Sequence, residues 1–125
     1  MIAIVDDDES MRESTQELVS SLGYRVAAFA SAEEFLLSDE VERTRCLIAD
    51  VRMPGLSGID LQSRLVAQGA CVPTIFITAF PEERTRLSAL KAGAVGYLGK
   101  PFSEESLVKC LNTALGSSDG NIPQR

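Results

Sequence analysis

Five short, mostly apolar runs separated by helical patterns limit the folds open to this 125-residue chain more than any other feature. The runs span residues 2–5, 25–29, 46–49, 74–77 and 95–98. Apolar runs of this length, without alternating polar residues, are typical of strands buried on both faces of a sheet. We therefore predict five strands.

A helical pattern follows each predicted strand. After the first, Met11, Thr15, Leu18 and Leu22 recur at helical spacing, and Gly23 stands where a helix C-cap favours a residue that adopts positive φ. The start signals of the other four helices are Ser31 with Glu34 in capping-box spacing, the turn-rich segment 53–58, Pro81 with two acidic residues after it, and Ser103 with two more. The fourth helix is expected to end at Gly93 and the last at about Leu115.

Strands that alternate with helices in a short chain predict an α/β fold. Right-handed crossovers place helices on both faces of a parallel sheet, so we expect a doubly wound, five-stranded parallel sheet with five helices. With 125 residues, one domain is expected, because two would each be too small for a good core. We assign the domain to residues 1–115. Residues 116–125 have no hydrophobic period and are interpreted as a flexible tail or the start of a linker.

Polar residues follow the predicted strands at the edge where ligands bind in open α/β sheets. They are Asp6, Asp7 and Asp8 after the first run, Asp50 after the third, Thr78 after the fourth and Lys100 just past the fifth. Clustered carboxylates need a counter-charge, and a hard cation such as Mg²⁺ is the simplest one. Such a site suits phosphoryl transfer, with Asp50 as the nucleophile. Taken singly, Asp8 is an equally good helix N-cap, Thr78 a turn former and Lys100 a solvated side chain.

Composition excludes several classes of function. The chain has no His, so it has no imidazole base, no Ser-His or Cys-His pair and no His metal ligand. Twelve basic against eighteen acidic residues give a net charge of −6, which disfavours nucleic acid or an anionic membrane as a partner of this chain alone. The first residues have neither a basic start nor a long apolar stretch, so we expect no signal peptide or membrane span and a cytoplasmic location.

Cysteine use agrees with a reducing compartment. Cys46, Cys71 and Cys110 are odd in number, have no CxxC spacing and lie among apolar residues. We expect buried or half-buried thiols rather than a disulfide framework or a zinc site.

Five motifs in a fixed order carry a family resemblance. They are IVDDDE at the end of the first strand, DVRMPGLSG from Asp50, TA from Thr78, AGAV from Ala92 and YLGKPF from Tyr97. Together they resemble the receiver domain of bacterial two-component response regulators and are similar to its FixJ-like group, over residues 1 to about 115. The resemblance implies a flavodoxin-like (CheY-like) sheet of order 2-1-3-4-5, and a signalling phosphoprotein rather than a turnover enzyme.

The same resemblance implies roles for the residues at the strand ends. Asp50 would be the phosphoacceptor for a phosphohistidine on a partner sensor histidine kinase. Mg²⁺, or Mn²⁺, would be held by Asp7, Asp50 and the backbone carbonyl of Arg52, with Asp6 acting mainly through water. Lys100 and the backbone amide of Ala79 would stabilise the phosphoryl group.

A switch is implied as well. The Thr78 hydroxyl would move to the phosphoryl group, and Tyr97 would turn inward into the vacated space and change the face formed by the fourth helix, fifth strand and fifth helix. The alternative for Tyr97 is an aromatic lid packed on a strand edge. We also expect Arg52 and Phe80 to flank the route of the attacking water and slow loss of the phosphoryl group. Gly96 and Gly99 receive no functional interpretation.

The implied partners follow from this family. A phosphorylation-dependent homodimer would form through the same face, near Lys91, Tyr97 and Lys109. DNA would be bound only through a transcriptional output domain absent from this chain, and no membrane contact is expected.

Two alternatives belong to other classes. The first is a small aspartate-nucleophile phosphohydrolase resembling the haloacid-dehalogenase group, with Asp6 and Asp8 in its first motif and Thr78 and Lys100 in the second and third. Its further acidic pair is missing, because only Asp119 lies beyond the start of the last helix. The second is a flavin-binding module, but the loop after the first strand holds three acids instead of a phosphate-binding sequence.

Overall fold

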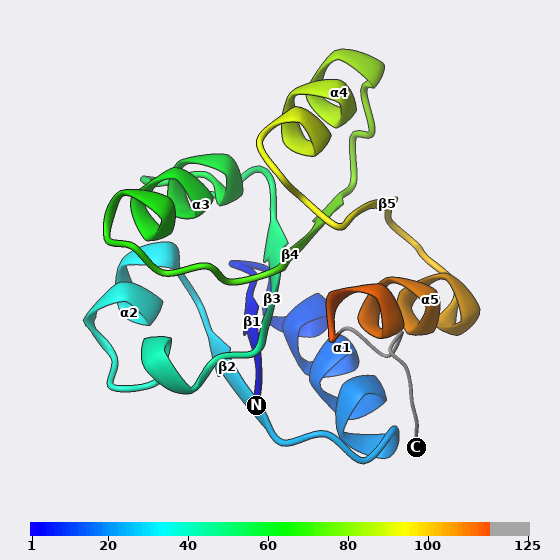
Figure 1. The fold of residues 1–125 in the computed structure, drawn as a ribbon. Coiled ribbons are helices and arrows are strands. Elements are labelled where there is room, and N and C mark those ends of the chain that lie inside the picture. The colour runs from blue at the N-terminus through cyan, green and yellow to red at the C-terminus, as the bar shows by residue number, and fades with distance from the viewer. Residues whose placement is uncertain (116–125) are drawn as a thin grey trace.

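The computed structural model of the chain describes residues 1–115, which form one α/β unit (Figure 1). The strands are β1 (Ile2–Val5), β2 (Val26–Phe29), β3 (Cys46–Asp50), β4 (Thr74–Thr78) and β5 (Gly96–Gly99). The helices are α1 (Glu9–Ser21), α2 (Ala32–Leu37), α3 (Gly58–Ala67), α4 (Glu83–Lys91) and α5 (Glu104–Ala114), with a 3₁₀ turn, η1, at Val41–Arg43. The predicted tail, 116–125, lies outside the described residues.

All five strands are parallel, in the order β2-β1-β3-β4-β5, which confirms the predicted fold. The pairing aligns the carboxyl ends of the strands: Val5 lies opposite Ala49, Asp50 opposite Ile77, and Thr78 opposite Gly99. Asp6, which follows β1, and Asp50, which ends β3, are therefore neighbours although they are more than forty positions apart in the sequence.

Helices cover both faces of the sheet, and each face has its own core. Alternate strand residues such as Val5, Leu47 and Phe76 pack with Phe35, Leu65 and Ala89 of α2, α3 and α4. The opposite residues of the strands pack with Val19 of α1 and with Leu107 and Leu111 of α5. Figure 1 shows α2, α3 and α4 on one side of the strands and α1 and α5 on the other.

Most predicted helix starts agree with the structure to within a residue. The side chain of Ser31 accepts a hydrogen bond from the amide of Glu34, and Ser57 and Asp60 form a reciprocal capping box at α3. In α2 the Glu34 carboxylate instead accepts from the amide of Ala30, so the predicted box there is incomplete. The start of α4 at Pro81 is wrong, because Glu82 is extended and the helix begins at Glu83.

Gly96 and Gly99 allow neighbouring segments to approach β5 closely. A Cβ at Gly96 would lie 2.5 Å from Cys110 Sγ on α5, and one at Gly99 would lie 3.1 Å from the ring of Pro81. The two glycines therefore have a packing role, on opposite ends of the same short strand.

The prediction for the cysteines is wrong at one position. Cys46 is buried, which raises the pKa of its thiol to about 12, and Cys110 is half-buried, with burial again raising the pKa. Cys71 is exposed, because it lies in the connection before β4 instead of in the strand itself. All three thiols are free.

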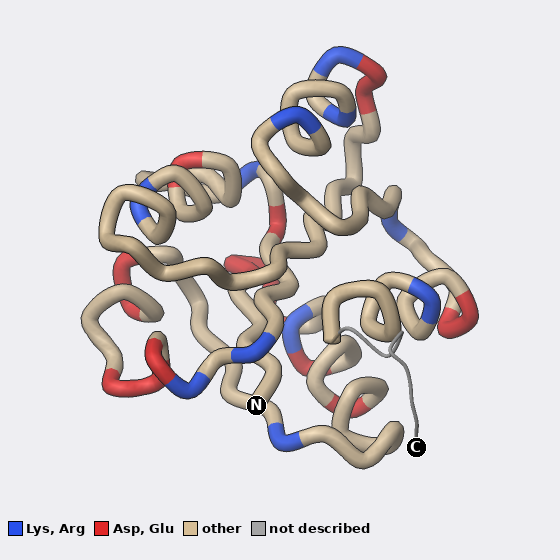
Figure 2. Tube along the Cα trace, viewed as in Figure 1, with Lys and Arg blue, Asp and Glu red and all other residues tan. Residues whose placement is uncertain are grey.

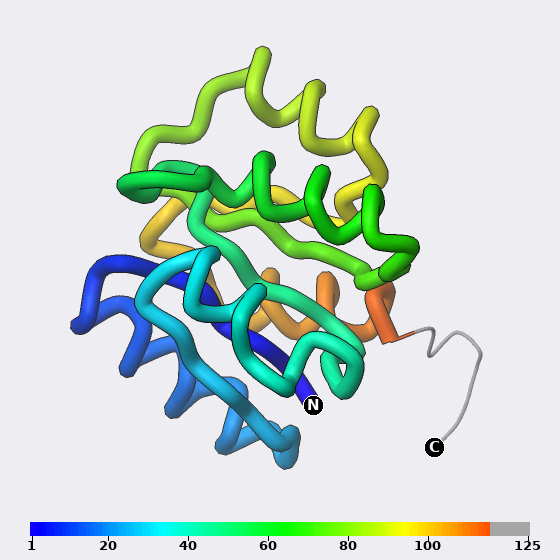
Figure 3. The backbone as a smooth tube through the Cα atoms, turned by 90° about the vertical axis from the view of Figure 1, so that its left-hand side faces the viewer, coloured from blue at the N-terminus to red at the C-terminus, as the bar shows by residue number. Residues whose placement is uncertain are grey.

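The helices differ in how much they bury. In α4 only Ala89 is buried, while Leu87 and Leu90 remain exposed. Figure 3 shows α4 as the outermost helix at the top of the molecule, and Figure 2 shows basic and acidic residues along it. Across residues 1–115, none of the helices has the length and apolar character needed to span a membrane.

Candidate functional site

Carboxylates from two neighbouring strand ends meet at one edge of the sheet. Asp6, Asp7 and Asp50 each place a carboxylate oxygen within 4.8 Å of the others. Asp6 is fully buried and Asp50 nearly so, whereas Asp7 is exposed. The parallel register of β1 and β3 produces this meeting, since Asp6 and Asp50 each follow one of the paired residues Val5 and Ala49.

Lys100 supplies the counter-charge from the far edge of the sheet. Its Nζ lies 3.0 Å from Asp6 Oδ2 and 3.0 Å from Asp50 Oδ2, with little of any of the three side chains exposed. Burial by itself would lower the pKa of Lys100, but the hydrogen bonds to Asp50 and Asp6 outweigh it and raise the pKa. Burial raises the pKa of Asp6, and the Asp8 amide and Lys100 only partly oppose this. Lys100 is therefore protonated at neutral pH and bridges the two carboxylates.

Backbone amides hold the remaining oxygens of the two buried carboxylates, and a side chain holds the backbone beside them. Asp6 Oδ1 accepts from the amide of Asp8 at 3.0 Å, and Asp50 Oδ1 accepts from the amide of Arg52 at 3.1 Å. The guanidinium of Arg12, one turn into α1, donates to the backbone carbonyl of Asp6 at 2.9 Å. Sequence reasoning missed Arg12, although its place beside the acidic loop was a usable signal.

The carboxylate of Asp8 is not part of the acidic cluster. Its carboxylate accepts a hydrogen bond from the amide of Met11 at 3.1 Å and caps the N-terminus of α1. This is the N-cap role considered from the sequence. The phosphohydrolase alternative needed Asp8 at the reacting centre, and it is not supported.

Thr78 ends β4 beside the site. Its side chain is buried, and its hydroxyl accepts from the amide of Phe80 at 3.0 Å. Its backbone carbonyl accepts from the amide of Lys100 at 2.7 Å, which fixes the start of the loop that carries this lysine. Ala79, the next residue, is exposed.

A second group of residues, Arg52, Phe80, Glu82 and Tyr97, surrounds the mouth of the site. The Arg52 guanidinium carbon lies 5.2 Å from the ring centre of Phe80, and its Nη2 lies 3.3 Å from Glu82 Oε1. Tyr97 is half-buried, and its hydroxyl accepts from the amide of Glu82 at 3.4 Å. The two residues predicted to tune rates, Arg52 and Phe80, are thus in contact with each other.

Gly58 holds the third strand end in place. A Cβ at this first residue of α3 would overlap the backbone oxygen of Asp50, and its amide donates to the carbonyl of Val51 at 3.1 Å. Only glycine lets α3 begin so close to Asp50. In the sequence, Gly58 lies in a turn-rich segment, and this contact with Asp50 was not predicted.

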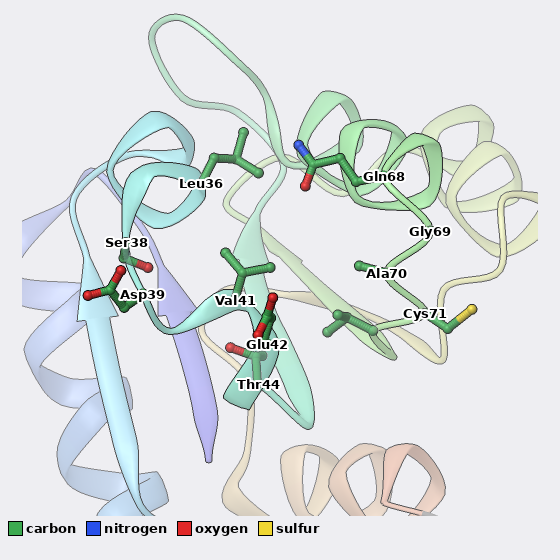
Figure 4. Close-up of a pocket in the computed structure, with 11 residues that line it drawn as sticks. Leu36, Ser38, Asp39, Val41, Glu42, Thr44, Gln68, Gly69, Ala70 and Cys71 are labelled. Carbon is green, nitrogen blue, oxygen red and sulfur yellow. The ribbon is translucent and has the colours of Figure 1, made fainter.

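An open groove lies at the opposite end of the strands, away from this chemistry (Figure 4). It has a volume of about 700 Å³ and lies between the end of α2 with η1 and the connection before β4. Its lining includes Ser38, Asp39 and Glu42 on one side and Gln68 and Cys71 on the other, as Figure 4 shows. The carboxylate cluster and Lys100 are not part of it, so we take the strand edge and not the groove as the functional site.

The acidic cluster fits a hard divalent cation. The atoms that could bind a metal are all carboxylate oxygens. The carboxylates of Asp6 and Asp50 are held by backbone amides, and the exposed Asp7 leaves one side open to water. Mg²⁺ prefers few carboxylates together with several waters.

Comparison with known proteins identifies relatives over almost the whole described part of the chain. The family model of the response regulator receiver domain matches residues 2–112. The response regulator protein TmoT of Ectopseudomonas mendocina is 44% identical over 115 residues, which cover 92% of this chain and 52% of TmoT. The transcriptional regulatory protein FixJ of Bradyrhizobium diazoefficiens is 36% identical over 118 residues, covering 94% of this chain and 58% of FixJ. The chain thus spans about half the length of these relatives.

Solved structures give the same likeness. The crystal structure of FixJ-N has a TM-score of 0.81 at 31% identity and covers 98% of this chain and 96% of its own. The response regulator StyR has a TM-score of 0.83 at 41% identity, covering 91% of this chain and 58% of its own.

Proposed function

This chain belongs to the response regulator receiver domain family, and from that premise we propose that it accepts a phosphoryl group on Asp50 and converts it into a change of the α4-β5-α5 face. The observation that most supports Asp50 is its position, nearly buried, 3.0 Å from Lys100 Nζ, with Asp6 on the other side of the same ammonium. A carboxylate held in this way is fixed for attack, and a cation is ready for the charge of the incoming group.

Mg²⁺ or Mn²⁺ would be held directly by Asp7, Asp50 and the carbonyl of Arg52, and by Asp6 mainly through water. A bound divalent cation neutralises the carboxylates and the oxygens of the transferring phosphoryl group. Lys100 would remain with Asp50 and bind a phosphoryl oxygen, and the Ala79 amide would bind another.

The transfer moves one phosphoryl group between two side chains. A carboxylate oxygen of Asp50 attacks the phosphorus of a phosphohistidine on a sensor histidine kinase. A P–O bond forms, the P–N bond breaks, and the imidazole leaves with the electron pair. Later, water attacks the phosphorus, the electron pair of the P–O bond returns to Asp50, and a proton of the water passes to solvent. The chain itself has no His, which agrees with an imidazole supplied by the partner.

The switch uses Thr78 and Tyr97. The Thr78 hydroxyl would exchange the amide of Phe80 for the phosphoryl group, and Tyr97 would leave the amide of Glu82 and turn inward. Because the phosphoryl group binds one arrangement better, it shifts the population toward that arrangement.

The wider role extends to parts beyond this chain. The relatives are about twice as long as this chain, and two of them carry regulatory names. We therefore propose that residues 1–115 form a receiver domain that controls a transcriptional output domain. Homodimers would form through the α4-β5-α5 face, near Lys91 and Lys109. DNA would be bound by the output domain only. The three free thiols support a cytoplasmic location.

Substitution of the acceptor tests the proposal. The chain is incubated with a small acyl phosphate carrying labelled phosphorus, with Mg²⁺ or with a chelator, and acid-stable and alkali-labile label is counted. We expect labelling of the wild type that needs Mg²⁺, and none for Asp50→Asn. Asp39→Asn, which changes charge equally in the distant groove, is the matched control and should label like the wild type. Label that survives in Asp50→Asn would overturn the proposal.

A further inference from the structure

Glu82 connects three segments at the mouth of the site. Its carboxylate Oε1 accepts from Arg52 Nη2 at 3.3 Å and from the Thr85 hydroxyl at 3.3 Å. Its backbone amide donates to the Tyr97 hydroxyl at 3.4 Å. Glu82 therefore connects the loop after β3, the first turn of α4 and the Tyr97 side chain on β5.

Arg52 extends this connection to the acceptor carboxylate. Its amide donates to Asp50 Oδ1 at 3.1 Å, while its side chain lies over Phe80 and against Glu82. A continuous path thus runs from Asp50 through Arg52 and Glu82 to Tyr97. It consists of hydrogen bonds and an ion pair, and any charge placed on Asp50 lies next to its first member.

Glu82 is not needed as a helix cap. It occupies the N-cap position of α4, but its side chain makes no capping hydrogen bond. The Glu82 carboxylate bonds side chains and not a backbone amide of α4, so its removal would cost the helix no backbone cap. The next acid, Glu83, is used differently, since it pairs with Arg86 within α4 at 2.6 Å.

We propose that Glu82 is a positioning residue: in the unphosphorylated protein it holds Arg52 and, through its amide, keeps Tyr97 at the N-terminus of α4. The role of this latch rests on the function proposed above. A phosphoryl group on Asp50 offers Arg52 a second anion whose oxygens suit the planar guanidinium. When Arg52 turns to the phosphoryl group, Glu82 loses its ion pair and keeps the Thr85 hydroxyl, so the first turn of α4 is released from the loop after β3 together with Tyr97.

The size of the effect follows from exposure. Both side chains of the Arg52–Glu82 pair are 58% exposed, so the pair is weak and is screened by salt. We expect it to change the ratio of the two Tyr97 positions by roughly 1.5- to 5-fold. A stronger pair would resist a single phosphoryl group.

Fluorine NMR of the full chain carrying 3-fluorotyrosine tests this latch. Tyr24 and Tyr97 are the two tyrosines, and Tyr24→Phe assigns the Tyr97 signal. The resting position of that signal is compared with its position in the protein saturated with Mg²⁺ and beryllofluoride, a phosphoryl mimic. Glu82→Gln is the test variant, and Glu83→Gln is the matched control with the same charge change one position away.

Glu82→Gln should move the resting Tyr97 signal toward the mimic-bound position, by an amount that corresponds to a change of roughly 1.5- to 5-fold in the ratio of the two Tyr97 positions. Glu83→Gln should leave the signal where it is in the wild type. The charge-swapped pair, Arg52→Glu with Glu82→Arg, should return the signal toward that of the wild type more closely than either single change. Equal shifts in Glu82→Gln and Glu83→Gln, or a swap without recovery, would overturn the latch. These resting-state measurements use no phosphate, so a failure of Asp50 to become labelled would refute the proposed function separately.

Discussion

The site edge of the sheet and helix α4 are built in opposite ways. At the edge, Asp6, Asp50 and Lys100 are nearly inaccessible and each ion pair measures 3.0 Å. In α4, one residue is buried, two leucines face solvent, and the pair that ties the helix to the site is 3.3 Å long and exposed. The two regions therefore have different roles. The charged side chains of the edge are held in fixed positions, as chemistry requires, whereas α4 is held weakly enough to move.

The sharpest way to break this comparison is to truncate one leucine of the tightly packed core and one leucine of α4. Leu65 of α3 is 1% exposed, so Leu65→Ala should lower the free energy of unfolding by about 2–5 kcal/mol. Leu87 of α4 is 54% exposed, and Leu87→Ala should change it by no more than about 0.5 kcal/mol. Urea unfolding followed by circular dichroism measures both. Equal losses would mean that α4 is held as firmly as α3.

An intermediate effect is expected where β5 meets α5, on the other side of the strand from α4. Gly96→Ala places a methyl group 2.5 Å from Cys110 Sγ and should cost about 1–3 kcal/mol of unfolding free energy. Cys110→Ala in the same chain removes the sulfur and should recover a part of that loss, so the two changes will not be additive. If the losses of unfolding free energy from the two changes add, the contact between Gly96 and Cys110 is not tight, and β5 is weakly packed against both α4 and α5.

The smallest effect concerns the cost of the buried charge. Because burial raises the pKa of Asp6 in the folded protein, folded Asp6 binds a proton before unfolded Asp6 does as the pH falls. This residue therefore opposes folding at neutral pH, and its penalty disappears as the pH falls through the raised pKa toward 3.8.

Asp6→Asn should consequently raise the unfolding free energy by about 0.5–2 kcal/mol at pH 7 without metal. The gain should shrink as the pH is lowered through that window. Exposed Glu9→Gln is a matched control and should show no such gain. A gain that is independent of pH would place the cost in packing instead of in charge.

The fold was predictable because its signals are local. Strands ended where apolar runs met Asp6, Asp50 and Thr78, and serines marked the starts of α2, α3 and α5. The predicted start of α4 at Pro81 was too early. Pro81 packs against Gly99 of β5, and the chain stays extended through Glu82. Cys71 was misjudged because apolar neighbours alone do not distinguish a strand from the connection that precedes it.

The centre of the site was predictable from topology, whereas its surroundings were not. Parallel strands bring Asp6, Asp50 and Lys100 to one edge whatever the helices do. The contacts of Arg12 with the Asp6 carbonyl and of Arg52 with Glu82 depend on side-chain directions set by packing. The sequence places Arg12 beside the acidic loop, but it does not encode which atom either arginine contacts.

The register of the sheet also determines which changes of length this protein can tolerate. A residue inserted at the start of β3 would turn every later side chain of that strand to the opposite face of the sheet. Asp50 would then lose its contact with Lys100, and Leu47 and Ile48 would each point into the core on the wrong face. Fold and chemistry would be lost in one event. An insertion at exposed Gly69, between α3 and β4, leaves all strand pairings unchanged. Natural variation in the length of this domain should therefore gather in the connections at the amino ends of the strands, opposite the acidic edge.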